Sequence, residues 1–94
     1  GAVMIATRAG VARFDGERWT SPPELAFPVN DLAVSRDGRL WLATARGIAV
    51  YDGRRVRRVD VRRGLLENEI GEIVVDDYGR LWARGARSLA VISP

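Results

Sequence analysis

The stretch LAVSRDGRLWLATARGIAVYDGRRVRRV, residues 32–59, decides the fold because parts of it recur on both sides. Its segment GIAVYDGRRV (47–56) repeats GVARFDGERW (10–19), 37 residues earlier. Its segment DGRLWLAT (37–44) returns as YGRLWARG (78–85), 41 residues later. A repeat of this period is typical of solenoids, propellers and arrays, in which function lies on surfaces that the stacked units create.

Four short β segments fit one unit, at residues 32–35, 39–44, 48–51 and 54–61. No window of useful length has the i, i+3, i+4 spacing of apolar residues that a helix needs. Asp-Gly pairs between apolar runs predict hairpin turns of type I′, with positive φ at both central residues. These pairs are Asp15-Gly16, Asp37-Gly38 and Asp52-Gly53.

The predicted fold class is therefore all-β, with antiparallel four-stranded blades of β-propeller type. Residues 1–94 form one segment of about two and a half blades. Residues 1–29 supply strands two to four of a partial blade, residues 30–68 a full blade, and residues 69–94 strands one to three of another. Propellers close with about four to eight blades, so we expect either a piece of a longer protein or an assembly of copies.

Aromatic residues recur at matching places in the units. Trp41 and Trp82 both lie on the second strand, and Phe14 and Tyr51 on the third. Small residues such as Ala43 and Ala49 lie between them, and large beside small is what two twisted sheets need to interdigitate. We interpret these aromatic residues as core between blades.

The run NDLAVSRDGRLWLATARGIAVYDG (30–53) closely resembles the two-component regulator propeller repeats of bacterial sensor proteins. The matching positions include Asp37-Gly38, Leu40-Trp41 and Tyr51-Asp52-Gly53. The third copy departs from the pattern with Ser88 in place of Gly. The resemblance implies an extracytoplasmic or periplasmic sensor module that binds a ligand, such as an acidic or neutral oligosaccharide, and signals through a distant kinase.

Composition limits the chemistry of the chain. It has no His, Cys or Lys, which removes the usual general base near neutral pH and two common nucleophiles. We expect no catalytic residue, no metal site and no cofactor; Asp76-Asp77 is interpreted as a turn pair. The net charge is +3, and all 15 basic residues are Arg. Coding bias explains this usage, and selection for bidentate anion recognition is the alternative.

Arginines recur in the loops that join strands two and three, and these loops share one face of a propeller. The candidate binding residues are Arg8, Arg46 and Arg87 in those loops, with Arg62 and Arg63 in a connection between blades. Such a rim would attract carboxylates, sulfates or phosphates; a solvated rim is the simpler interpretation. The arginines of the outermost strand are interpreted as protection of a sheet edge: Arg54, Arg55, Arg57 and Arg58.

Three functions remain open from the sequence. The first is a non-enzymatic binding or sensor module, with a ligand or partner on the loop face. The second is a self-assembling fragment whose copies build a closed homo-oligomeric ring. The third is a piece of a lyase- or glycosidase-type propeller, whose catalytic groups would lie in other blades. Nothing in the sequence indicates a nucleic-acid partner or membrane contact in this segment.

Overall fold

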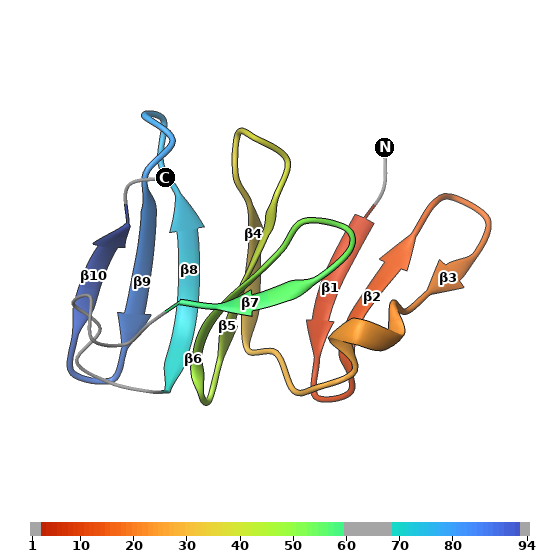
Figure 1. Ribbon diagram of the computed structural model, residues 1–94, viewed down its shortest axis with the longest axis horizontal. Helices are drawn as coiled ribbons and strands as arrows, with labels where there is room; N and C mark the ends of the chain where they lie inside the picture. Colours follow the sequence, from red (N-terminus) through yellow and green to blue (C-terminus); the bar gives the residue numbers. More distant parts are fainter. Residues whose placement is uncertain (1–2, 60–68, 93–94) are drawn as a thin grey trace.

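The computed structural model describes residues 3–59 and 69–92. These residues form three antiparallel sheets, so the all-β class is confirmed (Figure 1). We name them the first sheet (β1-β2-β3), the central sheet (β4-β5-β6-β7) and the third sheet (β10-β9-β8). The strands are β1 (Val3–Thr7), β2 (Gly10–Phe14), β3 (Trp19–Thr20), β4 (Asp31–Val34), β5 (Leu40–Thr44), β6 (Gly47–Tyr51), β7 (Val56–Arg58), β8 (Ile70–Val75), β9 (Leu81–Gly85) and β10 (Leu89–Ile92).

The central sheet is the four-stranded meander expected from the repeated unit. Strands β4, β5 and β6 lie within one residue of their expected bounds. The fourth strand is shorter than expected, because Arg54 and Arg55 belong to a loop in which both backbone N–H groups donate to the Asp52 carboxylate. Val59 still donates to the Ile48 carbonyl, 2.9 Å away, and the end of the predicted strand lies outside the described residues.

The prediction of type I′ turns is wrong. In the described residues every positive φ belongs to a glycine, so no Asp takes the conformation that a type I′ turn requires. Instead, Gly38 donates to the Ser35 carbonyl at 2.9 Å and has a φ of 85°. Ser35 in turn donates to the Arg39 carbonyl. This is a three-residue hairpin loop, a type I turn followed by a glycine bulge, in which the Asp37 carboxylate accepts the Arg39 N–H.

The central sheet is buried on both faces. One face packs on the third sheet through Trp41, Ala43, Ile48 and Val50. The other face meets the first sheet and the connection after it in a second cluster, which includes Val11, Leu25, Leu40, Leu42 and Ala49. Every residue of β5 is buried as a result, which explains why β5 is a continuous apolar run rather than an alternating one.

Core between sheets is the correct interpretation for Trp41 but not for all its counterparts. Trp41 is buried against the third sheet. Trp82 is only half-buried, and Phe14 is half-buried against Trp19, with the two ring centres 5.0 Å apart. Trp82 and Phe14 lie on the outermost faces of the stack, where the described chain places no further sheet.

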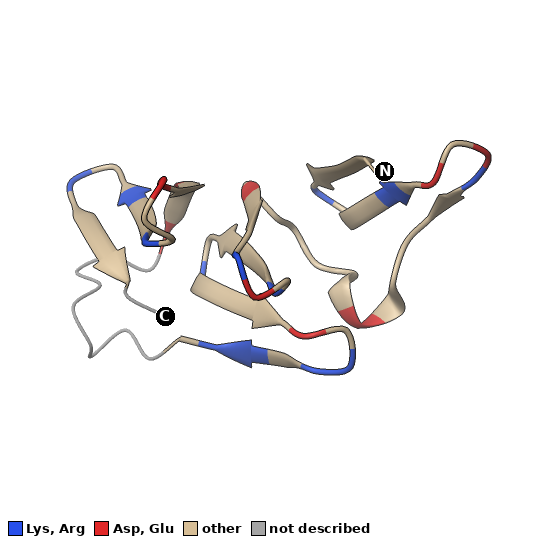
Figure 2. Cartoon of the chain, turned by 90° about the horizontal axis from the view of Figure 1, so that it is seen from above, with Lys and Arg blue, Asp and Glu red and all other residues tan. Residues whose placement is uncertain are grey.

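The three sheets spread like a fan from their inner strands. Strand β4 packs against both β8 and β1, while β10, β7 and β3 point outward in three directions (Figures 1 and 2). Polar contacts fix the central and third sheets at the inner edge. The Asn30 amide donates to the Ile70 carbonyl at 2.8 Å, and the Asp31 carboxylate accepts the Ile73 N–H at 2.9 Å.

A short connection links the first and central sheets. It contains a 3-10 helix, η1 (Pro23–Leu25), which begins at a proline and buries Leu25 completely. Val29 then donates to the Thr7 carbonyl at 2.9 Å and ties the connection to the end of β1. The sequence signals of this segment are its prolines, which predicted an interruption but not a helical turn.

Candidate functional site

Three hairpin loops point to the same end of the molecule, below the sheets in Figure 1. They join β1 to β2, β5 to β6 and β9 to β10, and they carry Arg8, Arg46 and Arg87 respectively. Each arginine is exposed and comes from a different sheet. Arg62 and Arg63, the other candidate binding residues, lie outside the described residues.

Two of the three loops are held by a threonine at the end of the preceding strand; the β9–β10 loop has Gly85 in that place. The Thr44 hydroxyl donates to the Gly47 carbonyl at 2.9 Å and accepts the Arg46 N–H at 3.0 Å. The equivalent Thr7 makes the same two kinds of bond in the β1–β2 loop. A threonine hydroxyl, buried at Thr44 and half-buried at Thr7, thus holds each of these two loops, and in the central sheet it fixes the backbone from which the Arg46 side chain extends.

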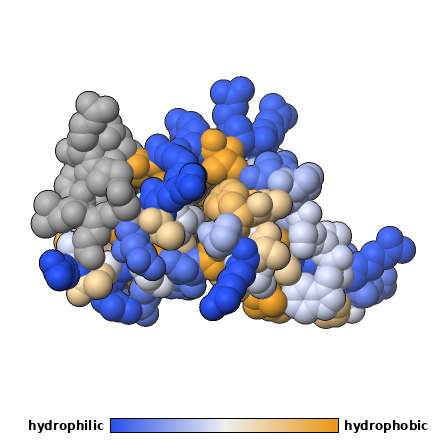
Figure 3. All heavy atoms as spheres, turned by 90° about the horizontal axis from the view of Figure 1, so that it is seen from below, coloured by the Kyte–Doolittle hydropathy of each residue, from blue (hydrophilic) through white to orange (hydrophobic). Residues whose placement is uncertain are grey.

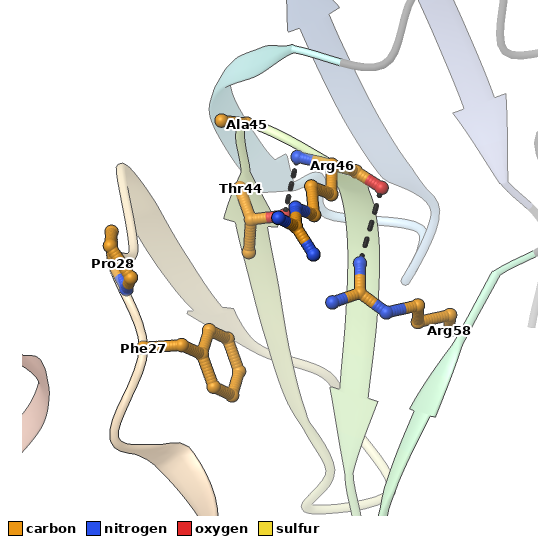
Figure 4. Close-up of a pocket in the computed structure, with 6 residues that line it drawn as sticks. All are labelled: Phe27, Pro28, Thr44, Ala45, Arg46 and Arg58. Carbon is orange, nitrogen blue, oxygen red and sulfur yellow. Dashed lines mark hydrogen bonds between the residues drawn. The ribbon is translucent and has the colours of Figure 1, made fainter.

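A hollow of about 330 Å³ lies beside the β5–β6 loop, at the same end. Figure 4 shows the Arg46 and Arg58 guanidinium groups and the Phe27 ring turned toward it. Arg58 donates through Nη1 to the Arg46 main-chain carbonyl at 3.3 Å, which holds the Arg58 guanidinium against the backbone of the β5–β6 loop. The lining residues are Phe27, Pro28, Thr44, Ala45, Arg46 and Arg58.

Arg58 was missed as a binding residue by the sequence analysis. It lies on β7, the outermost strand of the central sheet, which agrees with its interpretation as an edge residue. However, Arg58 pairs with Ala49 of β6, and its long side chain reaches back under the β5–β6 loop to Arg46. Basic residues are dense along β7 and the loop before it (Figure 2). Successive side chains of a strand point to opposite faces of the sheet, so Arg58 and its neighbour Arg57 lie on different faces.

Phe27 was also missed, and its position follows from the connection after the first sheet. Phe27 donates its N–H to the Leu25 carbonyl at 2.9 Å, so the chain turns tightly just after η1. With Leu25 buried and Val29 bonded to Thr7, the segment between them is fixed at both ends. The half-buried Phe27 ring therefore forms a fixed apolar wall of the hollow.

The positive charge of the two arginines that line the hollow is not paired with a carboxylate among the described residues. In residues 3–59 and 69–92, neither Arg46 nor Arg58 forms an ion pair, whereas Arg39, Arg80 and Arg84 each pair with a carboxylate. Two neighbouring guanidinium groups favour an anion between them, because it satisfies both forks and relieves their repulsion. The arrangement can hold a carboxylate, sulfate or phosphate group whose apolar part lies on Phe27.

A second hollow, of about 450 Å³, lies between the first and central sheets and is lined by the turns at the other end. Its charged lining groups are Arg13 and Asp52, which are opposite in sign. It therefore offers no net field that would select an anion or a cation, and the Arg46–Arg58 hollow is the stronger candidate.

Four aspartates use their carboxylates to hold turns: Asp15, Asp37, Asp52 and Asp76. Asp76 accepts the Trp82 indole N–H at 2.9 Å, the Arg80 guanidinium at 2.7 Å and two backbone N–H groups. These bonds, led by the one from Trp82, hold the pKa of Asp76 far below its ordinary value of 3.8. Backbone donors likewise lower the pKa of Asp15 and Asp52, and chiefly the Ser35 hydroxyl lowers that of Asp37. The interpretation of these residues as turn formers is confirmed.

In the part of the chain that the structure describes, no group of three or more acidic, His or Cys residues could hold a metal ion. No helix in the same residues is long and apolar enough to cross a membrane. No family model and no curated protein matches the chain.

Proposed function

We propose that this chain is a propeller segment that acts as a non-enzymatic binding module, like the two-component regulator propellers that its repeats resemble. Three observations support the propeller assignment: a four-stranded meander in the central sheet, equivalent strands in its two neighbours, and a fan of sheets around β8, β4 and β1. The function itself is argued from the site, because a fold alone is a weak guide to function.

The ligand that fits the Arg46–Arg58 hollow is an anion with an apolar face. The single observation that carries this proposal is the pair of guanidinium groups beside the Phe27 ring, with no ion pair to either arginine in the described residues. An acidic sugar matches both parts of the site, since its carboxylate fits the arginine pair and its C–H face fits an aromatic ring. A hollow of this volume suits one or two sugar rings.

Binding would join three parts of the chain that the site brings together. Arg46 lies on the β5–β6 loop, Arg58 on the edge strand β7 and Phe27 on the connection to the first sheet. A ligand that contacts all three would change the packing of the first sheet on the central one. That change is the kind of signal that a sensor module passes on, and we place the parent protein outside the cytoplasm on the resemblance alone.

The test is a comparison of two matched ligands, a uronic-acid disaccharide and its neutral counterpart with hydroxymethyl in place of carboxylate. We expect the acidic sugar to shift the NMR signals of Arg46 and Arg58 and the neutral one to bind at least about tenfold more weakly. The salt dependence of binding should be marked, because the arginines are exposed.

Three variants locate the site. Arg46→Ala and Arg58→Ala should each weaken binding of the acidic disaccharide about tenfold or more, a loss of about 1.4 kcal/mol. Arg54→Ala is the matched control, because it removes the same charge from the loop before β7 without touching the hollow. Equal losses in all three variants would mean attraction by net charge alone and would refute the site.

A further inference from the structure

Both ends of the stack of sheets are bare apolar faces. The outer side of the first sheet carries Val3, Ile5, Phe14 and Trp19, which we call the Trp19 face. The outer side of the third sheet carries Val74, Trp82, Leu89 and Val91, which we call the Trp82 face. Cross-strand pairing puts the members of each face on one side of their sheet. In Figure 3, seen from below, hydrophobic atoms reach the surface among hydrophilic ones in the middle of the molecule and along its lower edge.

The repeat assigns to each residue of the Trp19 face a counterpart in the core between the first and central sheets; two of these are buried and two partly buried. Adding 37 to the number of each residue on this face gives its equivalent in the next repeat. These equivalents lie on the side of the central sheet that packs on the first sheet. Ile5, for example, is 44% exposed, while its counterpart Leu42 is 0% exposed. The counterparts of Val3, Ile5, Phe14 and Trp19 are Leu40, Leu42, Tyr51 and Val56.

The Trp82 face has the same relation to the other side of the central sheet. A shift of 41 residues carries it onto the side that packs on the third sheet. Leu89 is 63% exposed, while its counterpart Ile48 is 1% exposed. The counterparts of Val74, Trp82, Leu89 and Val91 are Ala33, Trp41, Ile48 and Val50.

The two sheet junctions inside the chain follow one rule. At each junction, the tryptophan side of one sheet packs on the opposite side of the next, as Trp41 packs with Leu81 of the third sheet. In the first sheet, Met4 takes the place of that tryptophan and packs toward Leu40. The Trp82 face thus corresponds to the side of the central sheet that carries Trp41, but no sheet of the described chain packs on it. The Trp19 face corresponds to the side of a sheet on which such a tryptophan side packs, and it too has no neighbouring sheet in the described chain.

We propose that the Trp82 face of one copy of this chain packs on the Trp19 face of a second copy, and that the second copy returns the same contact. Two copies would then form a closed head-to-tail ring of six sheets, three from each. Six lies within the four to eight blades that close a propeller. Figure 2 shows the three sheets spread like a fan, as neighbouring blades of a propeller are.

The Trp82 face also carries two charged residues, which neutralise each other. Arg84 and Glu72 lie on the same side of the third sheet and form an ion pair at 2.9 Å, so they add no net charge to the face. Apolar faces that pair with one another also explain why two tryptophans remain accessible at the ends of the stack, since large apolar patches mark interaction surfaces. This inference goes beyond the proposed ligand site and does not depend on it.

Native mass spectrometry of the full chain and two variants tests the proposal. The wild-type chain should be a dimer, and Trp19→Arg and Val91→Arg should each weaken association at least about tenfold, because each places a charge in both junctions. Tyr78→Arg is the matched control, since Tyr78 is highly exposed in a turn outside both faces. Far-UV circular dichroism of each variant checks that the sheets are formed.

Mixing the two variants distinguishes head-to-tail packing from like-with-like packing. The Trp19→Arg copy keeps a sound Trp82 face, and the Val91→Arg copy keeps a sound Trp19 face, so the mixture should form a heterodimer through one restored junction. If like faces paired, mixing would restore nothing and the proposal would be wrong. A monomeric wild-type chain or an open polymer would likewise overturn the two-copy ring.

Discussion

At the scale of single residues, the repeats place two tryptophans in equivalent positions with different hydrogen bonds. The Trp82 indole donates to Asp76, while the buried Trp41 indole has no hydrogen-bond partner in the described chain. The residue equivalent to Asp76 is Ser35, whose shorter hydroxyl donates to Asp37 instead. One repeat therefore satisfies its indole and the other leaves it unbonded, which costs stability in a buried position.

This difference predicts a stabilising change. Ser35→Asp combined with Asp37→Asn gives Trp41 the carboxylate that Trp82 has, without two carboxylates side by side. We expect the free energy of unfolding to rise by about 1 kcal/mol, measured by urea denaturation. Asp37→Asn alone is the control, and a double variant no more stable than this control would show that the aspartate does not reach the indole.

Asp76 should also make stability depend on pH. Its pKa in the folded chain lies far below the ordinary value of 3.8, so the unfolded chain takes up the proton at higher pH. The stabilisation of the folded chain by the ionised Asp76 is complete above about pH 4. It is lost as the pH falls from there toward the pKa of Asp76 in the folded chain. We expect Asp76→Asn to be less stable than wild type at pH 7 and the gap to shrink below pH 4.

The control for this titration is Asp77→Asn, which removes the neighbouring carboxylate but leaves the bond to Trp82 in place. Denaturation curves recorded between neutral and acidic pH provide the measurement. A gap between wild type and Asp76→Asn that stays constant over this range would refute the coupling between Asp76 ionisation and folding.

At the scale of elements, the β1–β2 hairpin packs tightly on η1. Gly10 has a φ of 134°, and a Cβ added there would lie 2.2 Å from the Leu25 carbonyl oxygen. Gly16 has a φ of 106° but open space around it. Gly16→Ala should therefore cost about 1–3 kcal/mol for backbone strain, and Gly10→Ala distinctly more, because η1 must also move.

Urea denaturation of the two glycine variants measures this difference. Because both positions share the backbone strain, the excess cost of Gly10→Ala reports the contact with η1 alone. Equal costs would contradict the close packing of the hairpin on the connection. The same displacement should disturb Phe27, two residues beyond Leu25, and so reduce binding at the Arg46–Arg58 hollow.

Much of the element arrangement could be predicted from the sequence. The spacing of turns and apolar runs predicts the strands of the central sheet, because a short apolar run between turn residues is a local property of the sequence. The turn type was wrong, since Asp37 acts through its side chain on Arg39 and leaves the positive φ to Gly38. Local propensity cannot distinguish these two uses of Asp-Gly.

The candidate site could be predicted only in part. Arg46 follows from its place in a repeated loop, but Arg58 and Phe27 reach the same hollow through contacts between segments far apart in the chain. Those contacts depend on the length of the Arg58 side chain and on the turn after η1, which no repeat of the sequence reveals. The Phe27 segment has no counterpart among the residues that match between repeats.

At the scale of the whole molecule, the repeats explain both what is buried and what is not. The central sheet is protected on two sides, and its neighbours on one side each. The residues on the end faces are the counterparts of residues that are buried or partly buried in the centre. In the two-copy ring that we propose, the pattern that folds the chain would also direct its association, and no residue of either apolar face lines the Arg46–Arg58 hollow.

The most direct test of this account is small-angle X-ray scattering of the chain with an in-line mass measurement. We expect twice the chain mass of 10.4 kDa and the scattering of an oblate disc, because six sheets around one axis form a flat ring. A particle with the mass of one chain and a radius of gyration close to 12.8 Å, the value for a single copy, would contradict the account.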